Sequence, residues 1–288
     1  MRKQDNYIYI WCAATFLFLA SGCVKDKLHD EPFPEKGALA MTVDWTQRSS
    51  GVDIPAGHVV KAGDIMLVVS GMTDVFLSPL EPGAYPVLVY NEPEGMTVTG
   101  NEATVAELED GTLEPLPGYL FSGAVTATIV AGDTTRVTVQ ARQLVRDVRF
   151  TMRLSATDAG RVARVTAVLS GVAGRVTIPR GEVLAGETGR KVRFVLSPAG
   201  KTGESVLVMG MRLVGVADDA RQWLALELTL TDGSVHELAA ELTAELSAFG
   251  QSATPLELET NLQLPVKAGV TATITGWKVV DNGTAEVK

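Results

Sequence analysis

Residues 38–45 read Ala-Leu-Ala-Met-Thr-Val-Asp-Trp. Apolar side chains occupy every second position of this stretch: Leu39, Met41, Val43 and Trp45. A period of two predicts a β-strand with one buried face, because successive side chains of a strand point to opposite faces. Residues 148–154 repeat the pattern. The repetition indicates that a second unit of the same kind begins there.

Short apolar stretches separated by turn signals continue along the chain. They predict strands at 64–70, 86–90, 122–130, 135–142, 162–170, 174–178, 191–196, 204–214, 224–230, 235–242, 256–264 and 270–280. The clearest hairpin of the first half joins 122–130 to 135–142. In the second half, Asp232-Gly233 supplies the positive φ angles of a tight hairpin turn.

Two stretches depart from the strand pattern. Residues 91–118 are rich in Glu, Pro and Gly and are predicted to form a long irregular excursion. Residues 243–249 are the one predicted helix, with Thr243 as its N-cap and Gly250 as its stop.

The regular strand spacing and the scarcity of helix predict an all-β protein built from two β-sandwiches in series. We place the N-terminal sandwich at residues 37–142 and the C-terminal sandwich at 143–288. The length beyond residue 36 is more than one core usually fills, which also favours two domains.

The first 22 residues have the organisation of an export signal. Arg2 and Lys3 form a basic start, and residues 7–20 are uncharged and largely apolar. A helix that crosses a bilayer needs about 20 apolar residues, so this stretch predicts a signal peptide instead of a membrane span.

The residues after the apolar stretch predict lipidation. Ala20, Ser21 and Gly22 lead directly into Cys23, which resembles a lipobox with cleavage between Gly22 and Cys23 and a lipid on Cys23. The alternative is ordinary secretion with an incidental cysteine. Residues 23–36 hold two prolines and many charges, and they predict a tether. Within the tether, Lys25 and Asp26 resemble the charged signal that sends lipoproteins to the outer face of the outer membrane.

Charge and cysteine content exclude several classes of function. Removal of residues 1–22 takes away Arg2, Lys3 and Asp5, so the formal net charge changes from −9 to −10. An acidic chain repels phosphate backbones, and nucleic acid is not expected as a partner. Cys12 lies in the signal, so Cys23 is the only mature cysteine. Neither a disulfide framework nor a thiolate metal cluster is possible.

The sequence offers no catalytic constellation. His236-Glu237 begins like a zinc-protease motif, but Ala240 stands where the second histidine ligand is required. No Gly-x-Ser-x-Gly elbow or phosphate-binding Gly-x-x-x-x-Gly-Lys occurs. His58 and His236 are the only histidines beyond the tether, and each is interpreted as an exposed or hydrogen-bonded residue at a strand end. No catalytic residue, metal or cofactor is expected, and a hydrolase is the least favoured class.

Two smaller features have alternative interpretations. Asp133-Thr134-Thr135 resembles a bacterial O-glycosylation signal that a turn would expose, with Thr134 as the acceptor. Trp45, Trp223 and Trp277 are either ligand platforms or core residues. Their alternation with apolar neighbours favours the core.

Several stretches together resemble the FimB-like fimbrillin-associated anchor and accessory lipoproteins of Bacteroidetes type V fimbriae. The stretches that carry the resemblance are Ile54-Pro55, residues 80–91 (Leu-Glu-Pro-Gly-Ala-Tyr-Pro-Val-Leu-Val-Tyr-Asn), residues 165–172 (Val-Thr-Ala-Val-Leu-Ser-Gly-Val), and residues 228–233 onward to Thr273-Ile274-Thr275-Gly276-Trp277. Their order and spacing carry the match, which covers essentially the whole mature chain.

The resemblance implies two transthyretin-like Greek-key β-sandwiches and attachment to the outer membrane through the lipid, facing the cell exterior. It also implies fimbrial subunits as partners, joined by strand exchange at an open sheet edge. In shaft and tip subunits, cleavage after an arginine beyond the first strand removes that strand together with the lipid. Arg48 stands at that position, and its alternative interpretation is a solvated turn residue.

An anchor must keep Cys23, and the polar residues 281–288 make a poor donor strand. We therefore expect a fimbrial anchor or accessory subunit. The alternative function is a cell-surface glycan-binding lipoprotein, and a row of exposed aromatic residues would favour it.

Overall fold

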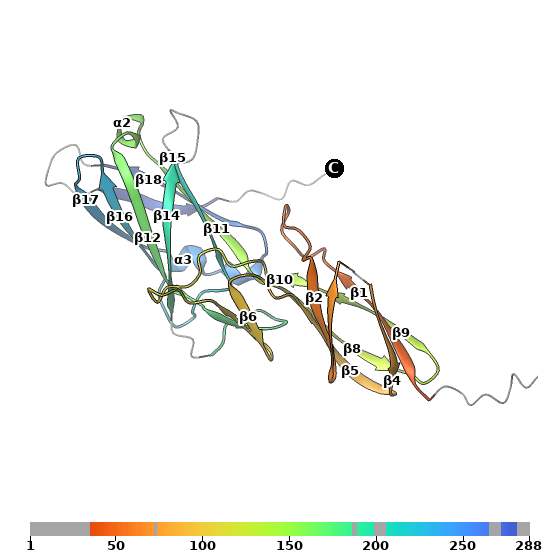
Figure 1. Ribbon diagram of the computed structural model, residues 1–288. Helices are drawn as coiled ribbons and strands as arrows, with labels where there is room; N and C mark the ends of the chain where they lie inside the picture. The colour runs from red at the N-terminus through yellow and green to blue at the C-terminus, as the bar shows by residue number, and fades with distance from the viewer. Residues whose placement is uncertain (1–34, 72–73, 186–188, 199–205, 265–271, 281–288) are drawn as a thin grey trace, which may run out of the picture.

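The computed structural model describes residues 35–71, 74–185, 189–198, 206–264 and 272–280. The regular structure of these residues is almost all β-strand, and the strands form two sandwiches that follow one another along the chain (Figure 1). The all-β fold class predicted from the two-residue periodicity is confirmed.

The N-terminal sandwich has two layers. One layer has the order β4-β1-β9, with β4 at Asp74–Leu80, β1 at Gly37–Asp44 and β9 at Thr134–Gln140. The other has the order β10-β8-β5-β2-β3, with β10 at Arg142–Gln143, β8 at Phe121–Ile129, β5 at Gly83–Tyr90, β2 at Gly57–Ala62 and β3 at Ile65–Ser70. β1 pairs antiparallel with β4 and parallel with β9, so it is the central strand of its layer.

The C-terminal sandwich is one folded ladder of eight strands. Its order is β17-β16-β12-β14-β15-β11-β18-β19, with β17 at Val235–Glu241, β16 at Trp223–Leu230, β12 at Val162–Val172, β14 at Arg190–Pro198, β15 at Val206–Leu213, β11 at Arg146–Arg153, β18 at Leu256–Gln263 and β19 at Thr273–Val279. In the described residues, β14 and β15 pair only through Ser197 and Pro198. The ladder folds over there, and the Phe150 ring on β11 lies 5.9 Å from the Phe194 ring on β14.

The expected hydrophobic alternation determines which side chains of β1 and β11 are buried in the two cores. Leu39, Met41 and Val43 of β1 are buried among residues of the N-terminal sandwich. Phe150 of β11 is buried in the C-terminal core, where its ring meets Trp277 edge-on at 5.3 Å. The predicted hairpin between β16 and β17 is also confirmed, with Gly233 at φ 84° in its turn.

The predicted hairpin of residues 122–130 and 135–142 is wrong. β8 pairs with β5, whereas β9 pairs with β1 in the facing layer. The turn between them therefore carries the chain from one layer to the other. Ala127 of β8 and Val139 of β9 are both buried in the core between the layers. A sequence that alternates correctly is compatible with either pairing, because both bury the same side chains.

The irregular excursion predicted at residues 91–118 is also wrong. It contains a hairpin of β6 (Met96–Thr99) and β7 (Glu102–Val105), and β7 pairs with β13 (Arg175–Thr177) of the C-terminal half. Several apolar residues of this region belong to the C-terminal core: Tyr90, Met96, Ala103, Val105, Leu113 and Leu120. Residues 91–120 thus lie between β5 and β8 of the N-terminal sandwich in the chain but pack with the C-terminal one.

The predicted helix is shorter than expected. α3 covers Thr243–Leu246, and a 3-10 turn follows at Phe249–Gln251, so Gly250 lies within that turn. Thr243 is the first helical residue and not the cap, which is Leu242. The Thr243 hydroxyl donates to Glu241 and accepts from the Gln222 N–H. One helix was not predicted: α2 covers Ala156–Ala159, capped by the Ser155 hydroxyl.

Candidate functional site: strand edges of the N-terminal sandwich

β3 is an edge strand that exposes apolar side chains. Within the described residues it pairs with β2 alone, so its other side presents unpaired backbone N–H and C=O groups. Four consecutive side chains are partly or largely exposed: Ile65 at 39%, Met66 at 57%, Leu67 at 38% and Val68 at 70%. The strand therefore offers a backbone ladder and an apolar surface together, which we call the β3 edge.

The neighbouring edge belongs to the facing layer. Residues 71–73 link β3 to β4, so the end of β3 lies near the start of β4. Phe76 on β4 is 63% exposed. β4 is nevertheless a poor pairing edge, because it carries Asp74 at its start and Pro79, which has no N–H to donate.

The other edges formed by the described residues have features that discourage pairing. Edge strands are commonly protected by charges, by shortness or by bulges. β9 carries Arg136, β17 carries His236, Glu237 and Glu241, and β19 carries Gly276 and Lys278, while β6, β10 and β13 have four residues or fewer. The β3 edge differs from all of these, because its six residues include neither a charge nor a proline.

The turn after β1 is tied to the C-terminal sandwich. The Arg48 guanidinium donates to the carbonyl oxygens of Trp45, at 2.7 Å, and Val52, at 3.0 Å. Ser49 is buried; its N–H donates to the Gln143 side chain at 2.9 Å and its hydroxyl donates to the Ala253 carbonyl. The Arg48–Ser49 peptide bond is thus fixed on both sides by hydrogen bonds.

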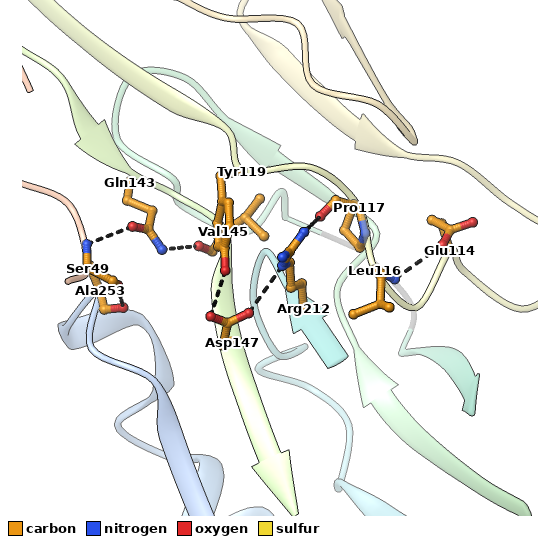
Figure 2. A network of polar contacts seen from close by, with 10 residues as sticks. All are labelled: Ser49, Glu114, Leu116, Pro117, Tyr119, Gln143, Val145, Asp147, Arg212 and Ala253. Atoms are coloured by element: carbon orange, nitrogen blue, oxygen red, sulfur yellow. Dashed lines mark hydrogen bonds and ion pairs between the residues drawn. The ribbon is translucent and has the colours of Figure 1, made fainter. Parts of the chain in front are cut away.

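A second set of polar contacts joins residues 117–119 to the C-terminal sandwich, as Figure 2 shows. The Tyr119 hydroxyl donates to one Asp147 oxygen at 2.7 Å, and Arg212 Nε donates to the other at 3.1 Å. The Arg212 guanidinium also donates to the Pro117 carbonyl at 3.2 Å and lies 4.0 Å from the centre of the Tyr119 ring. We call Tyr119, Asp147 and Arg212 the Asp147 network.

Burial shifts the pKa of two side chains near these contacts. Burial, followed by the hydrogen bond to Asp147, raises the pKa of the Tyr119 hydroxyl. His58 at the start of β2 is buried against the Trp45 ring, at 5.5 Å between centroids, and this burial lowers the His58 pKa. Its Nε2 has no hydrogen-bond partner among the described residues. The expectation of an exposed or hydrogen-bonded His58 is wrong.

The remaining predicted site residues fall in different places. Gly22, Cys23, Lys25 and Asp26 lie outside the described residues. Thr134 is the first residue of β9, where it is half-buried and pairs with Ala38 of β1. These assignments stay predictions.

All three tryptophans, Trp45, Trp223 and Trp277, were expected in the cores. Trp45 and Trp277 are buried, but Trp223 is 42% exposed, so the expectation for Trp223 is wrong. Trp223 stands next to Leu224, and the period of two puts Leu224 inside and Trp223 outside.

Catalytic and metal chemistry has little support in the described residues. Within the described ranges, no group of three or more His, Cys, Asp or Glu side chains is placed to hold a metal ion. His58 and His236 lie in different sandwiches. In the same ranges, no helix is long and apolar enough to span a bilayer.

Sequence reasoning missed the β3 edge because an apolar run is typical of a buried strand. The informative signal was the continuous run Ile-Met-Leu-Val-Val without polar alternation, which only the position of β3 in the sheet explains.

Comparison with known proteins agrees with the fold. A structure of the fimbrial anchor protein Mfa2 from Porphyromonas gingivalis matches with a TM-score of 0.54 and 7% identity, over 84% of this chain and 96% of that one. A candidate adhesin from Bacteroides ovatus matches with a TM-score of 0.59 and 10% identity, over 88% and 96%. Candidate polysaccharide-binding proteins from Bacteroides thetaiotaomicron match with a TM-score of 0.52 and 10% identity, over 86% and 99%. At these identities the likeness establishes the fold alone.

The sequence itself identifies the family. No curated protein matches this chain. The family model for fimbrillin-A associated anchor proteins Mfa1 and Mfa2 matches residues 58–283, which include the β3 edge and almost the whole C-terminal sandwich. That family consists of fimbrial anchors and is not a class of enzymes. The chain therefore belongs to the family of fimbrillin-A associated anchor proteins Mfa1 and Mfa2.

Proposed function

We propose that this protein is a lipid-anchored subunit of a fimbrium that keeps its first strand and receives a strand of a partner subunit along the β3 edge. The observation that carries the proposal is the six-residue, uncharged and exposed β3 edge, in a chain whose family associates with fimbriae. Strand addition needs only a free backbone ladder and side-chain pockets, so no catalytic residue is required.

Attachment follows from the lipobox-like sequence. A lipid on Cys23 holds the chain to the outer membrane, and residues 23–36 form the tether that leads into β1. A single acyl chain gives only weak membrane binding, whereas two or more hold a protein firmly. Lys25 and Asp26 direct the protein to the outer face.

Retention of β1 is supported by the contacts around Arg48. Cleavage after Arg48 would remove β1 with the lipid and leave a gap between β4 and β9. In the folded chain the Arg48 side chain is engaged by two backbone carbonyls, and Ser49 is buried and hydrogen-bonded. A protease needs an extended and accessible segment, so these contacts disfavour cleavage. With β1 in place, the β3 edge is the remaining acceptor in the N-terminal sandwich.

The proposal is tested by a charge on the β3 edge. Val68 is 70% exposed, so Val68→Lys leaves the core of the free protein unchanged. Covering a valine side chain is worth about 1.5–3 kcal/mol, and the exposed part of Val68 is worth about 1–2 kcal/mol of this. Loss of this contribution in Val68→Lys predicts that the partner binds about 5–30-fold more weakly. Fimbriae attached to cells and fimbriae shed into the medium are measured by electron microscopy and immunoblotting.

The matched control is Val235→Lys on β17, an edge of the other sandwich where the side chain is 55% exposed. We expect shedding with Val68→Lys and normal attachment with Val235→Lys, while both proteins melt at the wild-type temperature. Normal attachment with Val68→Lys would show that the β3 edge is not the acceptor.

The alternative, a glycan-binding surface lipoprotein, requires aromatic platforms. The large exposed aromatic side chains of the described residues are Phe76 on β4 and Trp223 on β16. They lie in different sandwiches and form no row. The fimbrial function is therefore preferred.

A further inference from the structure

A cleft of about 620 Å³ lies between the two sandwiches and is lined by arginines. The arginines come from four parts of the chain: Arg48 after β1, Arg142 on β10, Arg146 and Arg149 on β11, and Arg180 after β13. None of the described lining residues is acidic. The whole chain has a formal net charge of −9, so this concentration of positive charge is local and opposite in sign to the rest. We call it the arginine cleft.

Two of the five arginines have carboxylate partners. Arg149 lies 3.4 Å from Glu257, and Arg180 lies 3.5 Å from Glu182. The other three have none within the described ranges. Arg48 and Arg146 donate to backbone carbonyls, and exposed Arg142 forms no ion pair there.

The cleft wall is held in place by one of these guanidiniums. Arg146 donates to the Phe249 carbonyl at 2.6 Å and to the Thr254 carbonyl, and it lies 5.3 Å from the centre of the Phe249 ring. These contacts fix the segment that follows α3 against β11. Burial lowers the Arg146 pKa. A guanidinium nevertheless keeps its proton in proteins, so the side chain stays charged at neutral pH.

Like charges that share a small space repel one another, and the repulsion is strongest where water is partly excluded. Three guanidiniums without carboxylates therefore favour an anion in the cleft. A phosphate monoester carries a charge of about −1.5 to −2 and three terminal oxygens, whereas a carboxylate carries one charge and two oxygens. The phosphate matches the three guanidiniums that have no carboxylate partner better. Gln47, Ser50 and Ser252 add neutral polar groups to the lining, of the kind that bind sugar hydroxyls.

We propose that the arginine cleft binds a small phosphorylated molecule of the sugar-phosphate type, either free or as the headgroup of a membrane lipid. The volume lies within the range of about 300–1,000 Å³ that is usual for small-ligand sites. The ligand would bridge the two sandwiches, because its phosphate would contact arginines of both. The site is independent of the fimbrial role proposed above.

The test uses calorimetry on the purified chain carrying Cys23→Ser, which prevents lipidation. The probe is glucose 1,6-bisphosphate, and unmodified glucose is the neutral comparison. We expect saturable binding of the bisphosphate that weakens at least severalfold between about 50 and 200 mM salt, and no binding of glucose. Vesicles of phosphatidylcholine with and without a phosphoinositide then show whether a lipid headgroup occupies the same site.

Arg142→Gln is the informative variant, because Arg142 makes no ion pair in the described structure and its loss leaves the fold intact. We expect it to weaken bisphosphate binding about tenfold. Arg136→Gln is the matched control, since it removes the same charge from exposed β9, outside the cleft. Absence of saturation up to about 10 mM bisphosphate, or equal losses with the two variants, would overturn the proposal.

Discussion

Asp147→Ala is the sharpest test of how residues 117–119 are held against the C-terminal sandwich. The substitution removes the acceptor of both the Tyr119 hydroxyl and Arg212 Nε, and it leaves a cation beside the Tyr119 ring without its carboxylate. Only 17% of the Asp147 side chain and 28% of the Arg212 side chain are exposed, so water replaces the lost contacts incompletely.

The magnitude follows from these contacts. A hydrogen bond to a charged group contributes about 1.5–3 kcal/mol, and two are lost, but the partial exposure of Arg212 reduces the sum. We expect a loss of about 2–3 kcal/mol in the free energy of unfolding. For a protein of this size that corresponds to a fall of roughly 5–10 °C in the melting temperature.

The assay is thermal unfolding followed by circular dichroism and calorimetry. Glu259→Ala is the control, because Glu259 pairs with Arg153 at 2.9 Å on the surface, where both side chains are more than a third exposed. Such a pair contributes about 0–1 kcal/mol. If Asp147→Ala lowered the melting temperature no more than Glu259→Ala, the Asp147 network would not stabilise the packing of residues 117–119 against the C-terminal sandwich.

Three further predictions concern other groups. The His58 pKa is lowered in the folded state, so the stability is greatest above the unfolded pKa of about 6.5 and falls as the pH decreases through that value. His58→Phe should flatten this fall in denaturant titrations between pH 7.5 and 5. The Tyr119 pKa is raised, so the stability that the Tyr119 hydroxyl contributes is present below about pH 10 and is lost as the pH rises further. In Asp147→Asn, the absorbance of the Tyr119 tyrosinate should titrate at a lower pH than in the wild type. An unchanged titration would contradict the assigned hydrogen bond. Intact-mass analysis of the surface protein should find a lipidated chain that begins at Cys23, and a lipid-free chain that begins at Ser49 would contradict the retention of β1.

Local patterns in the sequence predicted most strands, but they predicted partners only for strands joined by a tight turn. The alternation at residues 38–45 identifies β1 and its buried face, and Asp232-Gly233 identifies the β16–β17 hairpin, because both depend on neighbouring residues alone. The pairing of β9 with β1 in place of β8 depends on residues almost a hundred positions apart. No local pattern distinguishes a hairpin from a crossing between layers when both bury Ala127 and Val139.

The candidate sites were harder to predict from the sequence than the strands, because they depend still more on long-range packing. Residues 91–118 looked irregular because their strands are only four residues long, and β7 is completed by β13, seventy residues later. The arginine cleft combines Arg48, Arg142 and Arg180, which are scattered along the sequence and look like ordinary surface charges. Cys23 is the opposite case, because a lipobox is read as a linear sequence and its prediction needs no fold.

The two variants at Val68 and Asp147 separate attachment from stability. In the proposed anchor, tension from the lipid enters through the tether into β1, which is held by β4 on one side and β9 on the other. A partner strand on β3 pulls on the other layer of the same sandwich. The load therefore passes through the core of the N-terminal sandwich and does not cross the Asp147 network. Asp147→Ala should lower the melting temperature while fimbriae stay attached, and Val68→Lys should release fimbriae while the melting temperature stays the same.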